Sequence, residues 1–447
     1  MKRFFVVITA ALALLGTSAS AFAQEKRVLT LDDCLRLALE RNPFYLAARE
    51  REGGAQAQLN EAASRFFPSL NAQGMNTLSE KPFELIFPSL IPDQPPQRIK
   101  IDFTRDYQMS LSLSLPIFTG GRLLSGYRQA DYNLRATQES IRQSRQETIF
   151  NVKKGFYGYL LAKQFVDVAE EVSALAENHH KTVKSLFDVG MASKFDLLRS
   201  EVEAANLKPQ LIRARNGLAV AELGLKSVLG LDLAEDVEFR GELTFVPQDT
   251  DVGEAVALAL LERPDLAQLQ FQRRMAGEIL KMARASGLPT LAVGGSYNYW
   301  ADQLKFTKGV WTNYYAVNLV LIIPIFNGFA ASAQVGQSKA LIRELELTQK
   351  GMTEMVKFEV RQAVLNYTQA REALLSQEKN VEQAREAVRI AELNYKEGLA
   401  TNLDVSGVQV ALSQARTNYS QALYDCVISQ AQLEKAVGRS RSESRSN

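Results

Sequence analysis

The chain has 447 residues, with 52 Lys and Arg against 50 Asp and Glu, so its formal net charge is only +2. A nearly neutral chain gives no electrostatic reason to expect nucleic-acid binding. It contains no nucleotide-binding glycine loop, metal-ligand cluster or Gly-x-Ser-x-Gly elbow, so neither an enzyme nor a cofactor is expected.

The N-terminus has the pattern of a secretory signal peptide over residues 1–23. A basic start precedes an apolar run over 4–15, and a small-x-small cleavage site follows at 21–23. The alternative is a membrane anchor, but the run is shorter than the roughly 20 residues that a span needs. No later stretch reaches 18 apolar residues. The mature protein is therefore either soluble and exported or enters a membrane as β-strands.

The rest of the chain contains a tandem duplication. Pro116-Ile117-Phe118-Thr119-Gly120 recurs as Pro324-Ile325-Phe326-Asn327-Gly328, a shift of 208 residues. The same shift relates three further pairs: Gly190 and Gly398, Asp196 and Asp404, and Gly230 and Gly438. Upstream the shift is 221, as from Pro68 to Pro289, so the first copy holds 13 additional residues. We expect a first structural repeat over 24–240 and a second over 241–438, within one integrated fold.

Each repeat opens with helices and continues with strands. In the first, an amphipathic helix over about 31–40 precedes a second helix over about 44–66, which ends before Pro68. A clear strand follows, with Tyr107, Met109, Leu111, Leu113 and Leu115 alternating with Gln108, Ser110, Ser112 and Ser114. The apolar side chains are expected to point outward and the polar ones inward.

The two predicted hairpins span about 69–115 and 290–323. Strands near ten residues, aromatic clustering in the second hairpin and the export signal favour a membrane barrel over an ordinary sheet packed on a core. The first hairpin loop carries five prolines: Pro82, Pro88, Pro92, Pro95 and Pro96. Because proline cannot donate to a ladder, we expect an exposed loop without continued strand pairing.

A very long helix follows each hairpin, over about 123–188 and 331–396, with no proline in either span. At 1.5 Å per residue each is about 100 Å long, and the apolar residues have coiled-coil spacing. Tip turns at about 189–196 and 397–404 then lead into returning helices over about 195–229 and 403–437.

The strand number predicts an oligomer. Two repeats supply four strands, which cannot close a barrel, and an open edge cannot lie in lipid. Two chains would give eight strands, a barrel filled by side chains, whereas three would give twelve and leave a conduit. We therefore expect a homotrimer in contact with membrane lipid. The alternative is an exported coiled-coil rod or spacer, which does not explain the alternating strands.

From about Leu29 to Gly438 the chain resembles the TolC family of outer-membrane efflux and secretion ducts. The resemblance lies in the duplicated Pro-Ile-Phe-x-Gly and in the tip segments Phe187–Leu197 and Tyr395–Val405. It implies a mainly α fold with a small β part, in which a trimer forms a twelve-stranded barrel in the Gram-negative outer membrane. It also implies a helical periplasmic tunnel, a periplasmic adaptor (membrane fusion) protein, and an inner-membrane transporter of the RND, ABC or MFS type.

The resemblance also implies functional residues. The adaptor-docking tips would be Val189, Gly190, Met191, Ala192, Ser193, Gly398, Leu399, Ala400 and Thr401. Tyr395 and Asp404 fall at gate positions, with Asp196 as the repeat counterpart of Asp404. Ala400 stands where a gating arginine can occur, and Gly407 where a second aspartate can occur. Both aspartates also suit the first turn of a helix, where the dipole favours an anion by about 0.3–1 kcal/mol.

The cysteines and histidines are expected to have structural roles. Cys34 and Cys426 align with Ala255 and Leu218 of the other copy, which favours buried hydrophobes over a disulfide. His179 and His180 are adjacent, so they do not share a helix face and make a poor metal pair. His180 lies on the heptad stripe and should be packed or hydrogen-bonded. The tail 439–447 is expected to be disordered.

Overall fold

The computed structural model of the chain describes residues 27–78, 83–88, 91, 95–101, 105–305, 307 and 309–439. The predicted signal peptide lies outside these residues, as does the predicted tail apart from Arg439. The described part is mainly helical and divides into two compact units. The strand unit comprises Ala47–Ser144 and Val256–Phe358, and the helical unit comprises the described residues of Met1–Leu46, Arg145–Ala255 and Glu359–Asn447.

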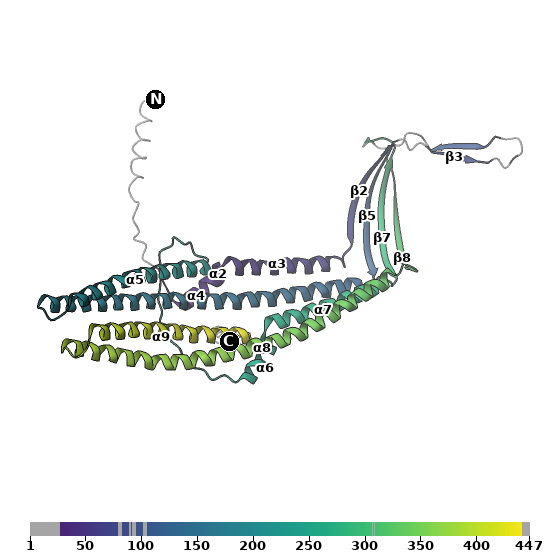
Figure 1. The fold of residues 1–447 in the computed structure, drawn as a ribbon. Helices are drawn as coiled ribbons and strands as arrows, with labels where there is room; N and C mark the ends of the chain where they lie inside the picture. Colours follow the sequence, from purple (N-terminus) through teal and green to yellow (C-terminus); the bar gives the residue numbers. More distant parts are fainter. Residues whose placement is uncertain are drawn as a thin grey trace, which may run out of the picture. The chain divides into compact units, whose positions relative to one another are not determined.

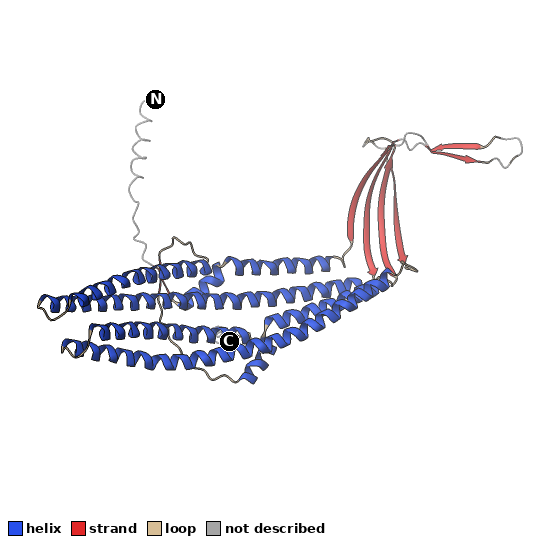
Figure 2. Ribbon diagram, in the orientation of Figure 1, coloured by secondary structure: helices blue, strands red, loops and turns tan. Residues whose placement is uncertain are grey.

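The strand unit contains a four-stranded antiparallel sheet, in the order β2-β5-β7-β8 (Figures 1 and 2). Its strands are β2 (Ser69–Leu78), β5 (Arg105–Phe118), β7 (Thr290–Ala301) and β8 (Thr312–Ile322). The pairing of β5 with β7 joins the first repeat to the second, with Ser112 opposite Ser296. The four strands that the sequence predicts are therefore present in one sheet.

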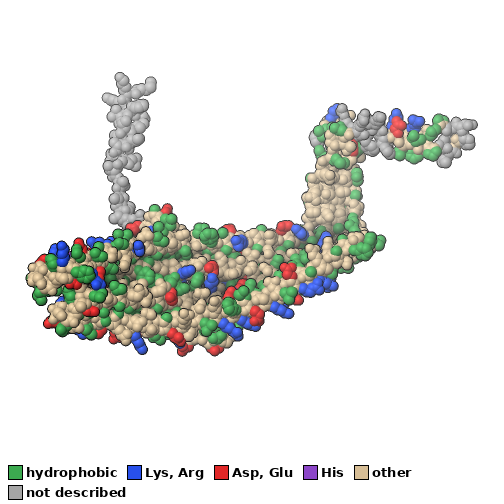
Figure 3. All heavy atoms as spheres, in the orientation of Figure 1, with side chains coloured by type: hydrophobic (Ala, Val, Ile, Leu, Met, Phe, Trp, Pro, Cys, Tyr) green, Lys and Arg blue, Asp and Glu red, His purple; other side chains and the backbone are tan. Residues whose placement is uncertain are grey.

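The sheet has an apolar face that the described residues leave uncovered. Val317 and Leu319 of β8 are 76% and 68% exposed, and Leu111 and Leu113 of β5 are also exposed. The opposite face carries small polar side chains along the middle of β5 and β7, including Ser110, Ser112 and Ser296. The side of the strands seen in Figure 3 shows few hydrophobic or charged groups. In the described part of the chain, β2 and β8 each have a single neighbour, so the sheet has two open edges.

The proline-rich insertion differs from its prediction. It contains a second hairpin, formed by β3 (Phe83–Phe87) and β4 (Gln97–Ile101). The expectation that prolines exclude a ladder was wrong because Pro88, Pro95 and Pro96 lie between the two strands rather than within them. An ion pair of 3.1 Å joins Glu84 and Lys100 across the ladder. Pro82 and Pro92 lie outside the described residues.

Helices adjoin the sheet at one end of its strands. They are α3 (Pro43–Ser64), α4 (Arg122–Asp188), α7 (Pro264–Ala285) and α8 (Ala330–Lys396). The turns into α4 and α8 use Gly120 and Gly328, both at φ 63°, a conformation that favours glycine. This requirement explains why the glycine of Pro-Ile-Phe-x-Gly recurs. Helices α4 and α8 have 67 residues each, about 100 Å at 1.5 Å per residue.

No helix of the described residues is both long enough and apolar enough to cross a bilayer.

The helical unit contains the remaining elements. These are β1 (Arg27–Leu29), α2 (Leu31–Arg41), α5 (Lys194–Leu229), β6 (Val237–Phe239), α6 (Val252–Glu262, which continues into the strand unit) and α9 (Asn402–Val437). Strands β1 and β6 pair in parallel. Helix α5 packs beside α4, where Leu225 closely approaches Gly155, and α9 lies beside α8 (Figure 1).

The core of the helical unit includes Cys34, Val152, Phe156, Leu225 and Phe239, all at most 2% exposed. Capping residues fix the chain around it. Thr30 and Asp33 form a capping box at α2, and the Asn42 side chain donates a 2.7 Å hydrogen bond to the Val228 carbonyl. Cys34 and Cys426 are buried and unpaired, which confirms their expected role as packed hydrophobes.

Candidate functional site at the two hairpin tips

The first tip joins α4 to α5 by a glycine turn. Gly190 has φ 82°, its N–H donates to the Phe187 carbonyl at 2.9 Å, and Met191 N–H donates to the Leu186 carbonyl at 2.8 Å. These bonds satisfy carbonyls that the helix end would leave unpaired. Ser193 then caps α5, because its hydroxyl donates to Asp196 Oδ2 at 2.6 Å and accepts from Asp196 N–H at 3.1 Å.

The second tip repeats this construction between α8 and α9. Gly398 has φ 75°, and Leu399 N–H donates to the Asn394 carbonyl at 2.8 Å. The Thr401 hydroxyl donates to Asp404 Oδ2 at 2.6 Å, and Thr401 N–H donates to the same oxygen at 2.8 Å. These hydrogen bonds from the hydroxyl and the backbone hold the pKa of Asp404 below its usual value. Both aspartates therefore have the helix-start role expected from their positions.

The tips expose apolar side chains to solvent. In the first tip the exposed apolar residues are Val189, Met191 and Phe195, and in the second they are Leu399 and Leu403. Each of these residues lies within a few positions of a helix end, so the turns and caps fix the backbone at these residues. Exposed apolar groups on a defined backbone suit contact with another protein.

A buried polar contact links the two hairpins just behind the tips. His179 of α4 is 9% exposed and Asn402 of α9 is 3% exposed, and Nε2 of His179 is hydrogen-bonded to Oδ1 of Asn402. Because an amide oxygen only accepts, Nε2 of His179 is the donor. The Asn402 amide nitrogen donates to the Asp196 carbonyl of α5 at 3.3 Å. Asn402 thus bridges the first hairpin from the second.

Tyr395 of α8 completes this cluster. Its ring packs edge-on against His179, with ring centroids 5.2 Å apart and an interplanar angle of 60°. Burial and, secondarily, the nearby Asp196 carboxylate raise the pKa of Tyr395, so the phenol stays neutral. We call His179, Asp196, Tyr395 and Asn402 the tip cluster, since each comes from a different helix.

The expected gate residues are thus divided. Tyr395 lies in the tip cluster with its ring, and Asp196 contributes its backbone carbonyl to Asn402. The carboxylates of Asp196 and Asp404 both turn back to the capping hydroxyls of Ser193 and Thr401. His180, predicted to be packed or hydrogen-bonded, bonds through Nδ1 to Ser200 Oγ at 2.9 Å, and that hydroxyl donates to the Leu197 carbonyl. Among the residues that the structure describes, no group of three or more His, Cys, Asp or Glu could hold a metal ion.

His179, Ser200 and Asn402 were not predicted as site residues. The duplication carried a signal for them, because the shift of 208 aligns them with Ala387, Val408 and Lys194. Tyr395 likewise aligns with Phe187. The turns and caps recur in both copies, while His179, Tyr395 and Asn402 of the tip cluster occur once.

Comparison with known proteins gives one consistent result. The model of the family "outer membrane efflux protein" matches residues 34–231 and again 255–439. The chain is 23% identical over 440 residues to the outer membrane protein TolC of Vibrio cholerae, covering 95% of this chain and 93% of that protein. It is 26% identical over 442 residues to the alkaline protease secretion protein AprF of Pseudomonas aeruginosa, covering 95% and 88%.

A solved structure shows the same fold. The Campylobacter jejuni CmeC outer membrane channel matches with a TM-score of 0.76 at 18% identity, over 91% of this chain and 85% of that one. The family model covers most of the chain and matches each of its two copies. The chain therefore belongs to the outer membrane efflux protein family.

Proposed function

We propose that three copies of this chain form the outer-membrane exit duct of a tripartite efflux or type I secretion system. The proposal rests on the four-stranded sheet, which has two open edges and an apolar face that no described residue covers. Lipid cannot satisfy an open strand edge, so β2 of one copy would pair with β8 of the next. Three copies would supply twelve strands and a lumen.

As a family member, the chain is an outer-membrane protein of a Gram-negative cell, and its helical part lies in the periplasm. Each copy contributes two 67-residue helices toward the tunnel. Family members are channel proteins, and this chain would act as a conduit without catalytic chemistry of its own. Its cargo would be small molecules or polypeptides, and the secretion role in the name of AprF supports the second class for that relative.

The tips would be both the docking site and the gate. Residues 189–193 and 398–401 would contact a periplasmic adaptor protein, which in turn would engage an inner-membrane transporter of the RND, ABC or MFS type. The exposed apolar side chains of the tips support such a contact. The tip cluster would hold the two hairpins of one chain together in the closed state, and three copies of Asp404 would surround the entrance.

Planar bilayers test this proposal. We expect the purified protein to form pores that stay mostly closed, and Asn402→Ala to raise the mean current by loosening the tips. The matched control is Lys194→Ala, at the repeat-equivalent position outside the tip cluster. A protein that is extracted from membranes without detergent and never conducts would instead be the coiled-coil spacer considered above.

A further inference from the structure

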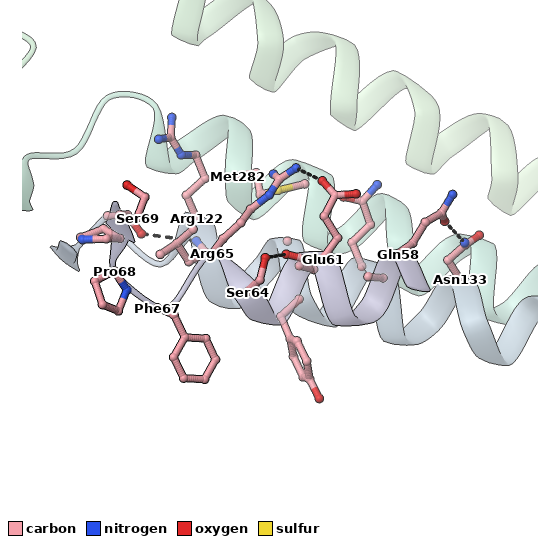
Figure 4. A pocket seen from close by; sticks show the side chains of 18 of the residues that line it. Gln58, Glu61, Ser64, Arg65, Phe67, Pro68, Ser69, Arg122, Asn133 and Met282 are labelled. Atoms are coloured by element: carbon pink, nitrogen blue, oxygen red, sulfur yellow. Dashed lines mark hydrogen bonds and ion pairs between the residues drawn. The ribbon is translucent and has the colours of Figure 1, made fainter. Parts of the chain in front are cut away.

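A hollow of about 1310 Å³ lies in the strand unit where helices meet strands (Figure 4). It is formed by the last turns of α3, the first turns of α4 and residues of α7. Its charged lining residues are Glu61, Arg65 and Arg122, and Met275 and Met282 of α7 add an apolar side. The hollow is separate from the tips, and none of the expected site residues lines it.

The charge of the hollow is positive. Arg65 forms a 2.8 Å ion pair with Glu61, which leaves Arg122 as the excess charge. Within the described residues, the Arg122 guanidinium has no hydrogen-bond or ion-pair partner. Figure 4 shows Arg65 and Arg122 pointing to the same side of the α3 and α4 layer, while Phe67 points to the other. Two guanidinium groups and a single carboxylate thus line one hollow.

The strand residues of the hollow identify the face on which it opens. Ser69 and Ser114 line it and stand directly opposite each other in the β2–β5 ladder. Ser114 belongs to the polar face of β5, together with Ser110 and Ser112, because side chains alternate along a strand. In the proposed trimer the polar face is internal, so the hollow opens into the duct. This step rests on the proposed function.

The second repeat lacks these groups. Arg65 aligns with Ser286, and Arg122 aligns with Ala330. The same helix–strand junction is therefore built without either arginine, so the fold does not require them. A trimer would carry three such hollows, one per chain, rather than six.

We infer that the hollow is a contact site for anionic solutes with an apolar body as they pass through the duct. A guanidinium presents paired donors that match carboxylate, sulfonate and phosphate oxygens. Methionine thioethers are flexible and adapt to apolar groups of different shape. The ligand class is therefore a carboxylate, sulfonate or phosphate attached to an aromatic or aliphatic group.

Single-channel block tests this site with naphthalene-1-sulfonate as the anionic probe and N-methylquinolinium as a cationic probe of similar shape. We expect the half-blocking concentration of the sulfonate to rise about tenfold in Arg122→Ala, as for the loss of one charge-assisted contact. Block by the cation should not weaken. The control, Arg128→Ala, removes an exposed arginine from the same helix that does not line the hollow, and should block as the wild type does.

A second variant changes the charge in the other direction. Glu61→Gln removes the carboxylate that pairs with Arg65, so the sulfonate should block at a lower concentration than in the wild type. Unchanged sulfonate block in both Arg122→Ala and Glu61→Gln would overturn the site while leaving the duct intact. A wild-type trimer that never conducts would overturn the proposed function, and the site with it.

Discussion

The two hairpin tips share their turn but differ in what they bury. Gly190 and Gly398 adopt the same left-handed conformation, and Asp196 and Asp404 form the same cap. The position of Asn402, however, is occupied by Lys194 in the first copy, and Asn402 forms hydrogen bonds to His179 and to the Asp196 carbonyl of the other hairpin. Residues that occur at equivalent positions in both repeats therefore form the turns and caps, which we call frame residues. Polar residues that occur in only one repeat are candidates for function.

The helix–strand junctions follow the same rule. Gly120 and Gly328 have the same φ of 63° and start equivalent helices. Arg122, two residues after Gly120, faces a hollow, whereas its counterpart is Ala330. Each substitution in one repeat therefore has a control, which is a matched substitution at the equivalent position of the other repeat.

The largest loss in the free energy of unfolding is expected at Gly120, a frame residue. A Cβ at Gly120 would lie 2.9 Å from the Leu288 Cβ, while one at Gly328 would meet nothing within 4 Å. Both alanine variants should lose about 1–2 kcal/mol for the left-handed backbone, and Gly120→Ala about 1–3 kcal/mol more for overpacking. Urea unfolding of the two variants measures the difference. Equal losses would show that the two junctions are packed alike.

The tip cluster should give the next largest effect. Asn402→Ala leaves the buried His179 N–H without its acceptor, which costs about 1–3 kcal/mol. Lys194→Ala, at the equivalent exposed position, should stay within about 0.5 kcal/mol. Thermal unfolding with a tryptophan or circular dichroism signal compares the two. An equal loss of stability in Lys194→Ala would show that Asn402 is no more important to the fold than its counterpart in the first tip.

The caps should respond to pH in a defined direction. Because Thr401 lowers the pKa of Asp404, the cap stabilises the fold above the ordinary carboxyl pKa of 3.8 and loses this contribution as the pH falls through the lowered value. Asp404→Asn should therefore be less stable than the wild type at pH 6, and the gap should narrow below about pH 4. A gap that is constant from pH 6 to pH 3 would contradict the role of the charged carboxylate.

The smallest difference between the two repeats is expected in the chemical reactivity of their cysteines. Burial raises the pKa of Cys34 to about 12 and that of Cys426 to about 11, so almost no thiolate exists at pH 8. A disulfide reagent should label neither cysteine in the folded protein and both after denaturation. Rapid labelling of one native thiol would show that its copy is the less tightly packed.

Much of the fold could be predicted because its signals are local and occur twice. Alternation along 107–115 identified a strand, and the Gly–Asp spacing identified both tips. The β3–β4 hairpin was missed because the five prolines were counted without regard to their positions, and four of them fall between Phe87 and Gln97 in the sequence. The His179–Asn402 contact joins residues 223 positions apart, and only three-dimensional packing brings them together.

Native mass spectrometry of the detergent-extracted protein tests most directly whether three chains close one cylinder. In the described part of the chain the four-stranded sheet ends in two unpaired edges, and a ring of three copies would pair all of them. We expect a single species with three times the mass of the mature chain, stable until the detergent micelle is removed. A monomer that remains dispersed without detergent would contradict the trimeric duct.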